Sequence, residues 1–355
     1  MAKAAVLRAP QTLEIEEFAL PAPEPESGLL RVEVAGVCTG TDTKLYHGKL
    51  DNPWPLIPGH EIVGVVEALG PGLAQTTGVQ VGTRVILRGA QCGRCEACRR
   101  GEGRFCPANP GYGLRTPTTV SPGLWGGYAE YVYLAPGAVL EPVPEGVSAE
   151  QALMATVFAN GLTWVLAQGG LRAGESLLVQ GVGQQGLMGI LAGRLGGASP
   201  IIAVGLGTDR ARLHLAKQLG ADWALAADQD AVGEVVAEVT DGQGVDLLLE
   251  VSGSPRGLIQ ALPWIRTGGR VVLASLSGKG VEVPVPLDEI VWRQIRVQGV
   301  YSKSATVLKD ALRILRHRRL PITELITHRL PLQEAALAME LAGRGGEVVK
   351  VVLLP

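Results

Sequence analysis

Four of the five cysteines in this 355-residue chain stand close together, at Cys92, Cys95, Cys98 and Cys106, with gaps of two, two and seven residues. Thiolates at such short spacing can surround one tetrahedral Zn2+, and four protein ligands leave no open position for a substrate. The spacing therefore predicts a structural zinc in a lobe of about residues 90–108.

Two other interpretations of these cysteines are weaker. A disulfide framework is typical of small secreted domains dense in cysteine, and this chain is long. An iron–sulfur cluster would fit the Pro107 that follows Cys106, but the bacterial motif has a shorter last gap. Zinc fits the spacing best.

The fifth cysteine, Cys38, precedes a Gly59-His60-Glu61 motif. Cys38 and His60 are too far apart in sequence to form a local metal loop, so they would have to meet in the fold. A mixed sulfur and nitrogen ligand set is typical of catalytic zinc. We therefore expect a second, catalytic metal site.

A glycine motif, Gly181, Gly183 and Gly186, follows the strand-like residues 177–180 and precedes a helix-forming stretch at 187–195. Between a strand and a helix, these glycines would supply a tight turn, a close approach to a pyrophosphate and close packing of the helix on the strand. The pyrophosphate would lie at the helix N-terminus, where free N–H groups favour anions. The motif predicts a dinucleotide site.

The acidic residue that would bind the adenosine ribose, expected about 20 residues further on, is missing. Gly205 occupies that place, followed by Asp209, Arg210 and Arg212. The absent carboxylate and the nearby arginines favour NADP slightly over NAD, although Asp209 could equally reach a ribose. All four residues are candidate cofactor contacts.

The chain is long enough for about two domains, and the residue pattern that predicts its secondary structure changes along the sequence. Short strands rich in β-branched and aromatic residues are expected at 32–34, 62–68, 84–87 and 128–133. Apolar strands that alternate with helices are expected at 177–180, 201–204, 247–251 and 271–274, with a helix at 305–319 and a terminal strand at 348–353. The second pattern predicts an α/β class with a doubly wound parallel sheet. We expect domains at 1–150 and 151–290, and a return to the first domain at 291–355.

Charge and composition point to a small-molecule substrate. The net charge is −2, and no basic stripe interleaved with aromatic residues indicates nucleic acid or an anionic membrane surface. The chain shows no signal-like N-terminus and no apolar stretch long enough to span a membrane. We expect a cytoplasmic protein.

The order of these motifs resembles the zinc-containing medium-chain dehydrogenase/reductase family, in the branch of alcohol, sorbitol and threonine dehydrogenases. The resemblance rests on Cys38, the Gly-His-Glu motif, the four-cysteine lobe, the sequence Gly-Tyr-Ala-Glu-Tyr at 127–131 and the glycine motif. It implies a GroES-like β-rich catalytic domain, a Rossmann domain inserted before the C-terminal tail, and a homodimer or homotetramer. Pairing often occurs through the last strand of the nucleotide-binding sheet.

The resemblance also implies roles for residues near the catalytic zinc. Cys38 and His60 would be ligands, and Asp42 would orient the His60 imidazole. Thr41 would relay the alcohol proton, and His47 would extend that relay, although His47 could equally be an exposed loop histidine. The sequence Cys-Thr-Gly-Thr-Asp at 38–42 is one residue longer than the family pattern.

The family takes its third zinc ligand, Cys or Glu, from the start of the linking helix, where this chain has Ala155. Glu61 is the nearest substitute and Glu150 a distant one. Three functions stay open: a zinc-dependent alcohol or polyol dehydrogenase, a zinc-independent enoyl or quinone reductase of the same fold, and a non-catalytic NADPH-binding protein. The presence of Cys38, His60 and Asp42 together favours the first.

Overall fold

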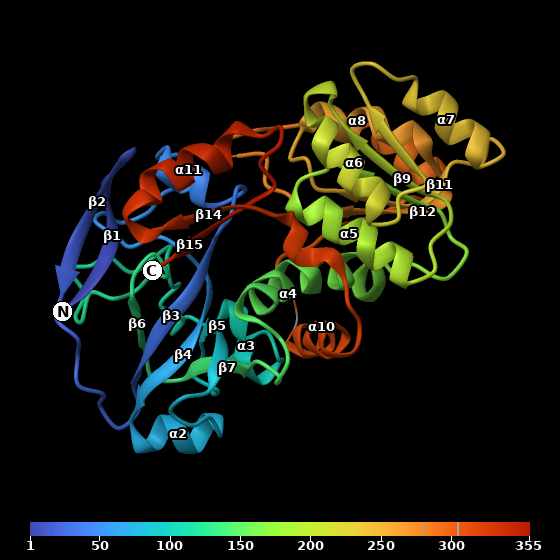
Figure 1. Cartoon of the computed structure of the whole chain (residues 1–355). Helices are drawn as coiled ribbons and strands as arrows, with labels where there is room; N and C mark the ends of the chain where they lie inside the picture. Colours follow the sequence, from blue (N-terminus) through green and yellow to red (C-terminus); the bar gives the residue numbers. More distant parts are fainter. Residues whose placement is uncertain (279, 304) are drawn as a thin grey trace. The chain divides into compact units, whose positions relative to one another are not determined.

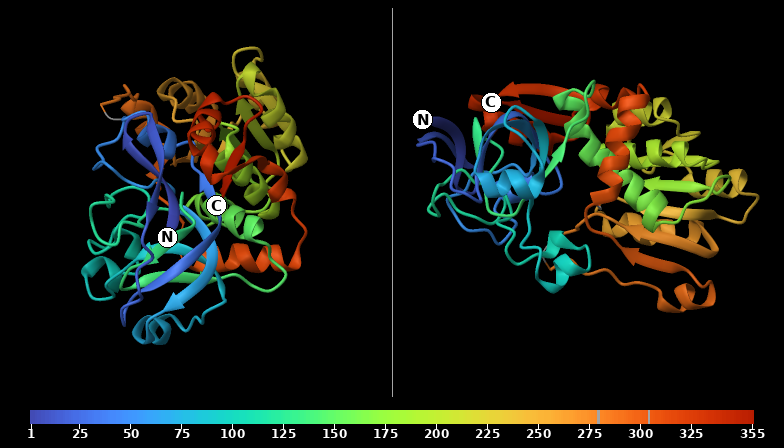
Figure 2. Two further views of the ribbon diagram at one scale, coloured as in Figure 1. Left: turned by 60° about the vertical axis from the view of Figure 1, so that its left-hand side comes forward. Right: turned by 90° about the horizontal axis from the view of Figure 1, so that it is seen from below.

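The computed structural model describes residues 1–278, 280–303 and 305–355. They form two compact units: Met1–Met154 with Leu312–Arg344 and Lys350–Pro355, and Ala155–Ala311 with Gly345–Val349. Both chain ends belong to the first unit (Figure 1 and Figure 2). The domain boundaries at 150 and 290 stay predictions.

The first unit is built on a seven-stranded sheet with strands from the N-terminal and the C-terminal parts of the chain. Its strands run in the order β14 (Ile326–Pro331), β15 (Lys350–Leu354), β3 (Gly28–Val37), β4 (Glu61–Leu69), β5 (Arg84–Ala90) and β7 (Ala138–Pro142), and β6 (Tyr131–Leu134) also pairs with β3. The C-terminal β15 runs antiparallel to β3, with Val351 opposite Val37. A separate hairpin comprises β1 (Ala2–Ala9) and β2 (Thr12–Phe18).

Most predicted strands of this unit are confirmed, since 32–34, 62–68 and 84–87 lie in β3, β4 and β5. The strand predicted at 128–133 starts too early, because β6 begins at Tyr131. The backbone of Tyr128 instead donates to Pro58 O and accepts from the Ala5 N–H. The terminal strand begins at Lys350, two residues later than predicted.

The second unit contains a six-stranded sheet in which every neighbouring pair is parallel. Its order is β10 (Trp223–Ala226), β9 (Ile201–Gly205), β8 (Leu177–Gln180), β11 (Val245–Glu250), β12 (Ile265–Leu273) and β13 (Arg296–Gly299). The first four of these strands in the sequence, β8 to β11, are followed in turn by the helices α5 (Gln184–Leu195), α6 (Arg210–Gln218), α7 (Val232–Val239) and α8 (Pro255–Ala261). The strand order reverses beside β8, as in a doubly wound nucleotide-binding fold. The predicted fold class is confirmed.

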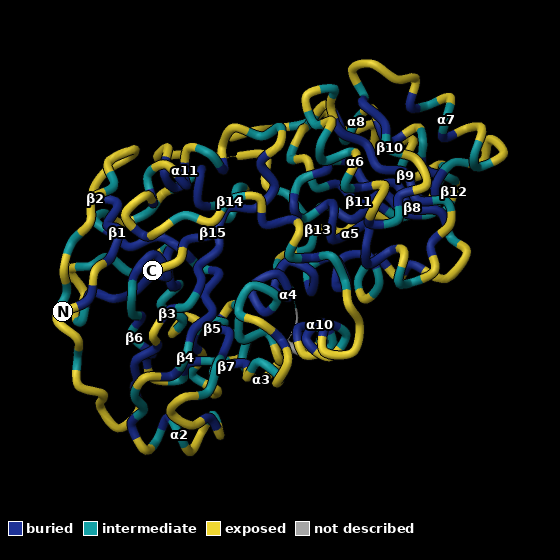
Figure 3. The backbone as a smooth tube through the Cα atoms, viewed as in Figure 1, coloured by how far each residue is buried: buried dark blue, intermediate teal, exposed yellow. Residues whose placement is uncertain are grey.

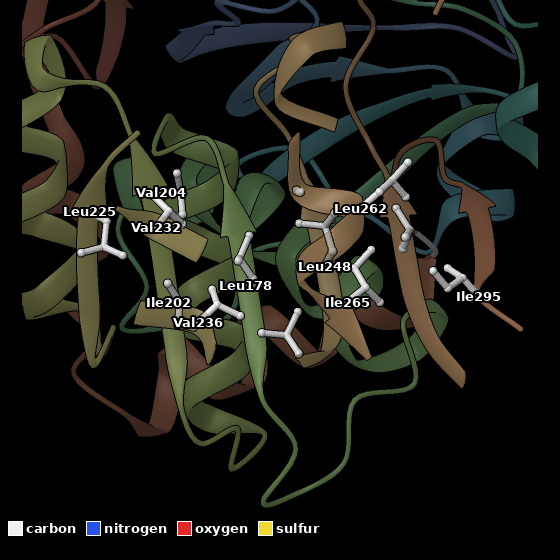
Figure 4. Close-up of a cluster of buried hydrophobic side chains, with 13 residues drawn as sticks. Leu178, Ile202, Val204, Leu225, Val232, Val236, Leu248, Leu262, Ile265 and Ile295 are labelled. Atoms are coloured by element: carbon white, nitrogen blue, oxygen red, sulfur yellow. The ribbon is translucent and has the colours of Figure 1, made fainter. Parts of the chain in front are cut away.

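Burial explains why the central strands are apolar runs. β8 and β9 are buried along their whole length, whereas the edge strand β13 is exposed (Figure 3). Leu178, Ile202 and Leu248 from three neighbouring strands pack with Val232 and Val236 of α7 in one core cluster (Figure 4). This core holds the strand that carries the glycine motif.

Seven further α-helices lie in the described part of the chain: α1 (Asp42–Tyr46), α2 (Pro71–Thr77), α3 (Glu96–Arg99), α4 (Ala149–Gly161), α9 (Leu287–Trp292), α10 (Ala305–His317) and α11 (Ala335–Arg344). The predicted helix at 305–319 is confirmed as α10, which ends at His317. Among the described helices, none is long and apolar enough to span a membrane.

Candidate functional site

Cys38 and His60 come together because two neighbouring strands end beside each other. Cys38 directly follows β3 and His60 directly precedes β4, and the antiparallel register places Gly36 opposite Glu61. One ligand atom from each of Cys38, His60 and Glu61 lies within 4.8 Å of the others. The sheet therefore gathers a sulfur, a nitrogen and a carboxylate oxygen that the sequence separates.

Asp42, the first residue of α1, lies beside the His60 ring. The Oδ1 atom of this fully buried carboxylate lies 3.1 Å from His60 Nδ1. Its Oδ2 atom accepts the Cys38 N–H at 2.9 Å and the Tyr128 hydroxyl at 2.9 Å. Because Nδ1 faces Asp42, Nε2 is the nitrogen left for a metal.

The pair is electrostatically coupled. Burial opposes the charge on Asp42, but His60 and the hydrogen bonds from Cys38 and Tyr128 hold the pKa of Asp42 below its usual value. Burial also opposes a charge on His60, yet the Asp42 carboxylate raises the pKa of His60 well above its ordinary value. Asp42 thus stays ionised and keeps a strong acceptor on the Nδ1 side of the ring.

Glu61 is close to the cluster but is also paired with a lysine. Its Oε2 accepts from Lys350 Nζ, and Lys350 donates a second hydrogen bond to Val37 O at 3.1 Å. The side chains of Glu61 and Lys350 are 8% and 0% exposed. Lys350 was missed by the sequence analysis, where its only signal is a charge at the start of an apolar terminal strand.

The other residues considered for this site have separate surroundings. Glu150 accepts from Arg329 through both carboxylate oxygens, at 2.7 and 2.8 Å, so its carboxylate is already paired. Thr41 is the N-cap residue of α1 and is partly buried. His47 is the C-cap residue of the same helix, exposed, with its ring edge-on to Tyr46. Ala155 is buried within α4.

The four remaining cysteines form a second cluster around α3 and a short 3-10 turn at Gly103–Phe105. The four sulfur atoms of Cys92, Cys95, Cys98 and Cys106 all lie within 4.8 Å of one another, and the thiols are not joined as disulfides. Backbone N–H groups donate to three of the sulfurs at 3.3–3.4 Å. Hydrogen bonds from Arg94 and Cys95 lower the pKa of Cys92 to about 6. Preformed N–H donors to sulfur fit a thiolate metal site.

The three motif glycines meet three different requirements. Gly181 has φ +106°, and a Cβ there would lie 2.7 Å from the Ser252 nitrogen. At Gly186 a Cβ would lie 1.8 Å from Gly181 O, so α5 packs directly on the turn. At Gly183 a Cβ would find no described atom within 4 Å. The turn is tight at its ends and open at Gly183, as a pyrophosphate site requires.

The residues after β9 differ in their availability to a ligand. Arg212 pairs with Asp209 at 3.2 Å, donates to Val348 O and is 13% exposed, so its guanidinium is occupied by the protein. Arg210, at the start of α6, is exposed. A Cβ at Gly205 would lie 2.6 Å from the Val182 side chain, which leaves little room for a carboxylate there.

Comparison with known proteins agrees with both halves of this architecture. Residues 24–145 match the alcohol dehydrogenase GroES-like domain, and residues 186–317 match the zinc-binding dehydrogenase domain. A probable alcohol dehydrogenase of Mycobacterium tuberculosis is 37% identical, over 91% of this chain and 89% of its own. The L-threonine 3-dehydrogenase of Pyrococcus furiosus is 32% identical, over 95% and 94%. The sorbitol dehydrogenase of Bacillus subtilis is 30% identical, over 99% and 97%.

Solved structures show the same fold over nearly the whole chain. The alcohol dehydrogenase TADH from Thermus sp. ATN1 superposes with a TM-score of 0.86 at 32% identity, covering 99% of each chain. A zinc-binding dehydrogenase from Sinorhizobium meliloti bound to NADP has a TM-score of 0.87 at 26% identity, over 100% of this chain and 99% of its own. The chain therefore belongs to the zinc-containing medium-chain dehydrogenase family and is an oxidoreductase of the alcohol and polyol dehydrogenase type.

Proposed function

We propose that this chain is a zinc-dependent dehydrogenase that transfers a hydride between NAD(P) and an alcohol or polyol, or the matching ketone or aldehyde. The observation that carries the proposal is the group of Cys38 and His60 with Asp42 behind the imidazole. When bound, zinc would act as a Lewis acid toward the substrate oxygen, and the nicotinamide would accept the hydride.

Each protein group in this proposal has a defined task. Cys38 Sγ and His60 Nε2 would hold the metal, and Asp42 would fix the ring through Nδ1. The Thr41 hydroxyl would take the proton released by the alcohol, and His47, exposed at the end of α1, would pass it to water.

Glu61 is our proposed third ligand. Its carboxylate lies within 4.8 Å of the other two ligand atoms, which supports the assignment. Lys350 competes for the same carboxylate, so Glu61 would bind the metal with one oxygen while the ion pair shares its charge. Two protein ligands alone would hold zinc weakly, and Ala155 offers no donor atom.

The substitution Glu61→Gln tests this assignment. We expect it to remove the second zinc and nearly all alcohol oxidation, whereas Glu150→Gln, which alters a paired carboxylate in the same unit, should keep both. Unchanged zinc content in Glu61→Gln would show that Glu61 is not a ligand. The converse variant, Ala155→Cys, should retain zinc more tightly if that position faces the metal.

The second cluster, Cys92, Cys95, Cys98 and Cys106, is our proposed structural zinc site. The four sulfur atoms lie within 4.8 Å of one another and could occupy all four positions of a tetrahedral zinc ion. Such an ion has no open position for a substrate. Metal binding would then contribute directly to the folding of this lobe.

For the cofactor, we propose NAD(P) over Gly181, Gly183 and Gly186, with a slight preference for NADP. The preference for NADP rests on Arg210, because the guanidinium of Arg212 is already bound to Asp209 and to Val348 O. Replacing Arg210 should lower the affinity for NADP relative to NAD, and an unchanged ratio would contradict the preference.

We also propose that the protein is a homodimer or homotetramer. In support, β13 is an exposed edge strand, and Val291 and Trp292 of the preceding α9 are 73% and 82% exposed. Unpaired edges and clustered apolar side chains mark surfaces that associate.

A substrate panel separates this function from the remaining alternative, a reductase of the same fold that lacks catalytic zinc. Primary, secondary and polyhydroxylated alcohols should be oxidised with NAD or NADP. If none is oxidised while a quinone or an activated double bond is reduced, the reductase assignment is correct.

A further inference from the structure

The buried phenol of Tyr128 lies directly behind the Asp42–His60 pair. Tyr128 is fully buried, and its hydroxyl donates to Asp42 Oδ2 at 2.9 Å. The same oxygen accepts the Cys38 N–H at 2.9 Å, while Oδ1 faces His60 Nδ1 at 3.1 Å. Two hydrogen bonds to Oδ2 restrict the rotation of the carboxylate and keep Oδ1 beside the imidazole.

The tyrosine is itself held from two sides. Its N–H donates to Pro58 O at 3.0 Å, and its carbonyl accepts the Ala5 N–H at 2.8 Å. Its ring packs against Gly59, which has φ +93° and where a Cβ would lie 2.4 Å from Tyr128 Cδ1. The Tyr128 ring thus occupies the space that a side chain at position 59, next to His60, would need.

We propose that Tyr128 is a positioning residue for the second metal site: it fixes the Asp42 carboxylate, which in turn fixes His60 with Nε2 directed away from Asp42. The inference rests on the proposed function only in that His60 binds the metal. The hydroxyl of Tyr128 donates to Asp42 Oδ2, and we expect it to act on His60 through that carboxylate.

Loss of the Tyr128 hydroxyl should lower the zinc affinity only moderately, because this hydroxyl contacts Asp42 and is not a proposed metal ligand. Removing a partner of a metal-ligating histidine typically weakens metal binding by about 10–100-fold, so deletion of the phenol oxygen should cost about tenfold. The carboxylate keeps the Cys38 N–H but gains freedom to rotate, and the imidazole loses its fixed acceptor.

The first experiment compares Tyr128→Phe with Tyr112→Phe. Tyr112 is also buried in the first unit, and its hydroxyl accepts the Ala135 N–H at 2.9 Å, so this control loses a buried hydrogen bond away from the metal ligands. In chelator competition, the zinc affinity of the Cys38–His60 site should be about tenfold lower in Tyr128→Phe and unchanged in Tyr112→Phe. Equal affinity in both variants and the wild type, or an equal loss in both variants, would overturn the proposal.

The second experiment uses metal-free protein and does not depend on zinc. In histidine-labelled protein, with His60→Gln for assignment, the His60 Nδ1–H proton should be downfield and protected from exchange in the wild type. Tyr128→Phe should broaden it or speed its exchange, and an unchanged signal would overturn the proposal. If the wild type binds no second zinc but this signal still responds, the proposed function fails while the positioning role stands.

Discussion

Among the three motif glycines, Gly183 is the one where a side chain would meet no described part of the fold. A Cβ there would meet no described atom, whereas a Cβ at Gly181 or Gly186 would collide with backbone. Stability and cofactor binding can therefore be separated at this one residue.

We predict that Gly183→Val abolishes binding of NAD(P) and leaves the thermal midpoint nearly unchanged, because the new side chain enters the space of the pyrophosphate. Gly186→Ala is the contrasting variant and should lower stability, since its Cβ would lie 1.8 Å from Gly181 O. Fluorescence titration with NADH and NADPH and thermal denaturation check both. Normal affinity in Gly183→Val would place the pyrophosphate elsewhere.

The sequence indicates the residues proposed for the candidate metal site, Asp42 included, but not the contacts of Lys350 and Tyr128. Cys38, His60 and Asp42 have types and spacing that indicate zinc chemistry. Lys350 has an ordinary local sequence, and Tyr128 belongs to the motif at 127–131, which does not indicate a contact with Asp42. Both reach the site through the pairing of β15 with β3 and through the contacts of Pro58 and Ala5. Such contacts depend on strand register, which short-range patterns do not encode.

In the parallel sheet of the second unit, one carboxylate connects β11 to both of its neighbours, β8 and β12. Asp246 in β11 accepts from the Ser176 N–H and hydroxyl at 2.9 and 2.8 Å, just before β8, and pairs with Arg266 of β12 at 2.6 Å. Burial opposes its charge, but the bonds from Ser176 and Arg266 lower the pKa of Asp246 below its usual value.

We predict that Asp246→Asn lowers the free energy of unfolding by about 1–2 kcal/mol at neutral pH. Because the folded pKa is lowered, this contribution is present above the unfolded pKa of about 3.9 and is lost as the pH falls through the folded pKa. Urea denaturation at pH 7 and near pH 3 measures the free energy of unfolding of the wild type and of Asp246→Asn. The difference between the two proteins should be smaller near pH 3. Glu238→Gln, an exposed carboxylate of α7, should change little at either pH.

The predictability of an element depended on its burial. Strands β8, β9 and β11 were predicted because they are buried on both faces and read as apolar runs. β13, with the sequence Arg-Val-Gln-Gly and every residue exposed, gives no such signal, although it pairs with β12. It was therefore placed in the tail, beyond the predicted nucleotide-binding domain.

At the scale of the whole molecule, we predict an oligomer that depends on the surface around β13. Light scattering of the wild type should give the mass of a dimer or tetramer, and the double change Val291→Glu and Trp292→Glu should lower it without loss of secondary structure. Both side chains are largely exposed in the single chain, so the charges should not disturb its core. Val81→Glu, at a 61% exposed position of the first unit, is the control. A monomeric wild type would contradict the prediction.

Counting zinc per subunit in freshly purified, unchelated protein would show whether this dehydrogenase has two separate metal sites. We predict two ions in the wild type, one at each cluster. Cys38→Ser should keep one ion and lose alcohol oxidation, and Cys95→Ser should lose the other ion with a lower thermal midpoint while nucleotide binding persists. A wild type that holds a single zinc, retained in Cys38→Ser and lost in Cys95→Ser, would show that Cys38 and His60 bind no zinc.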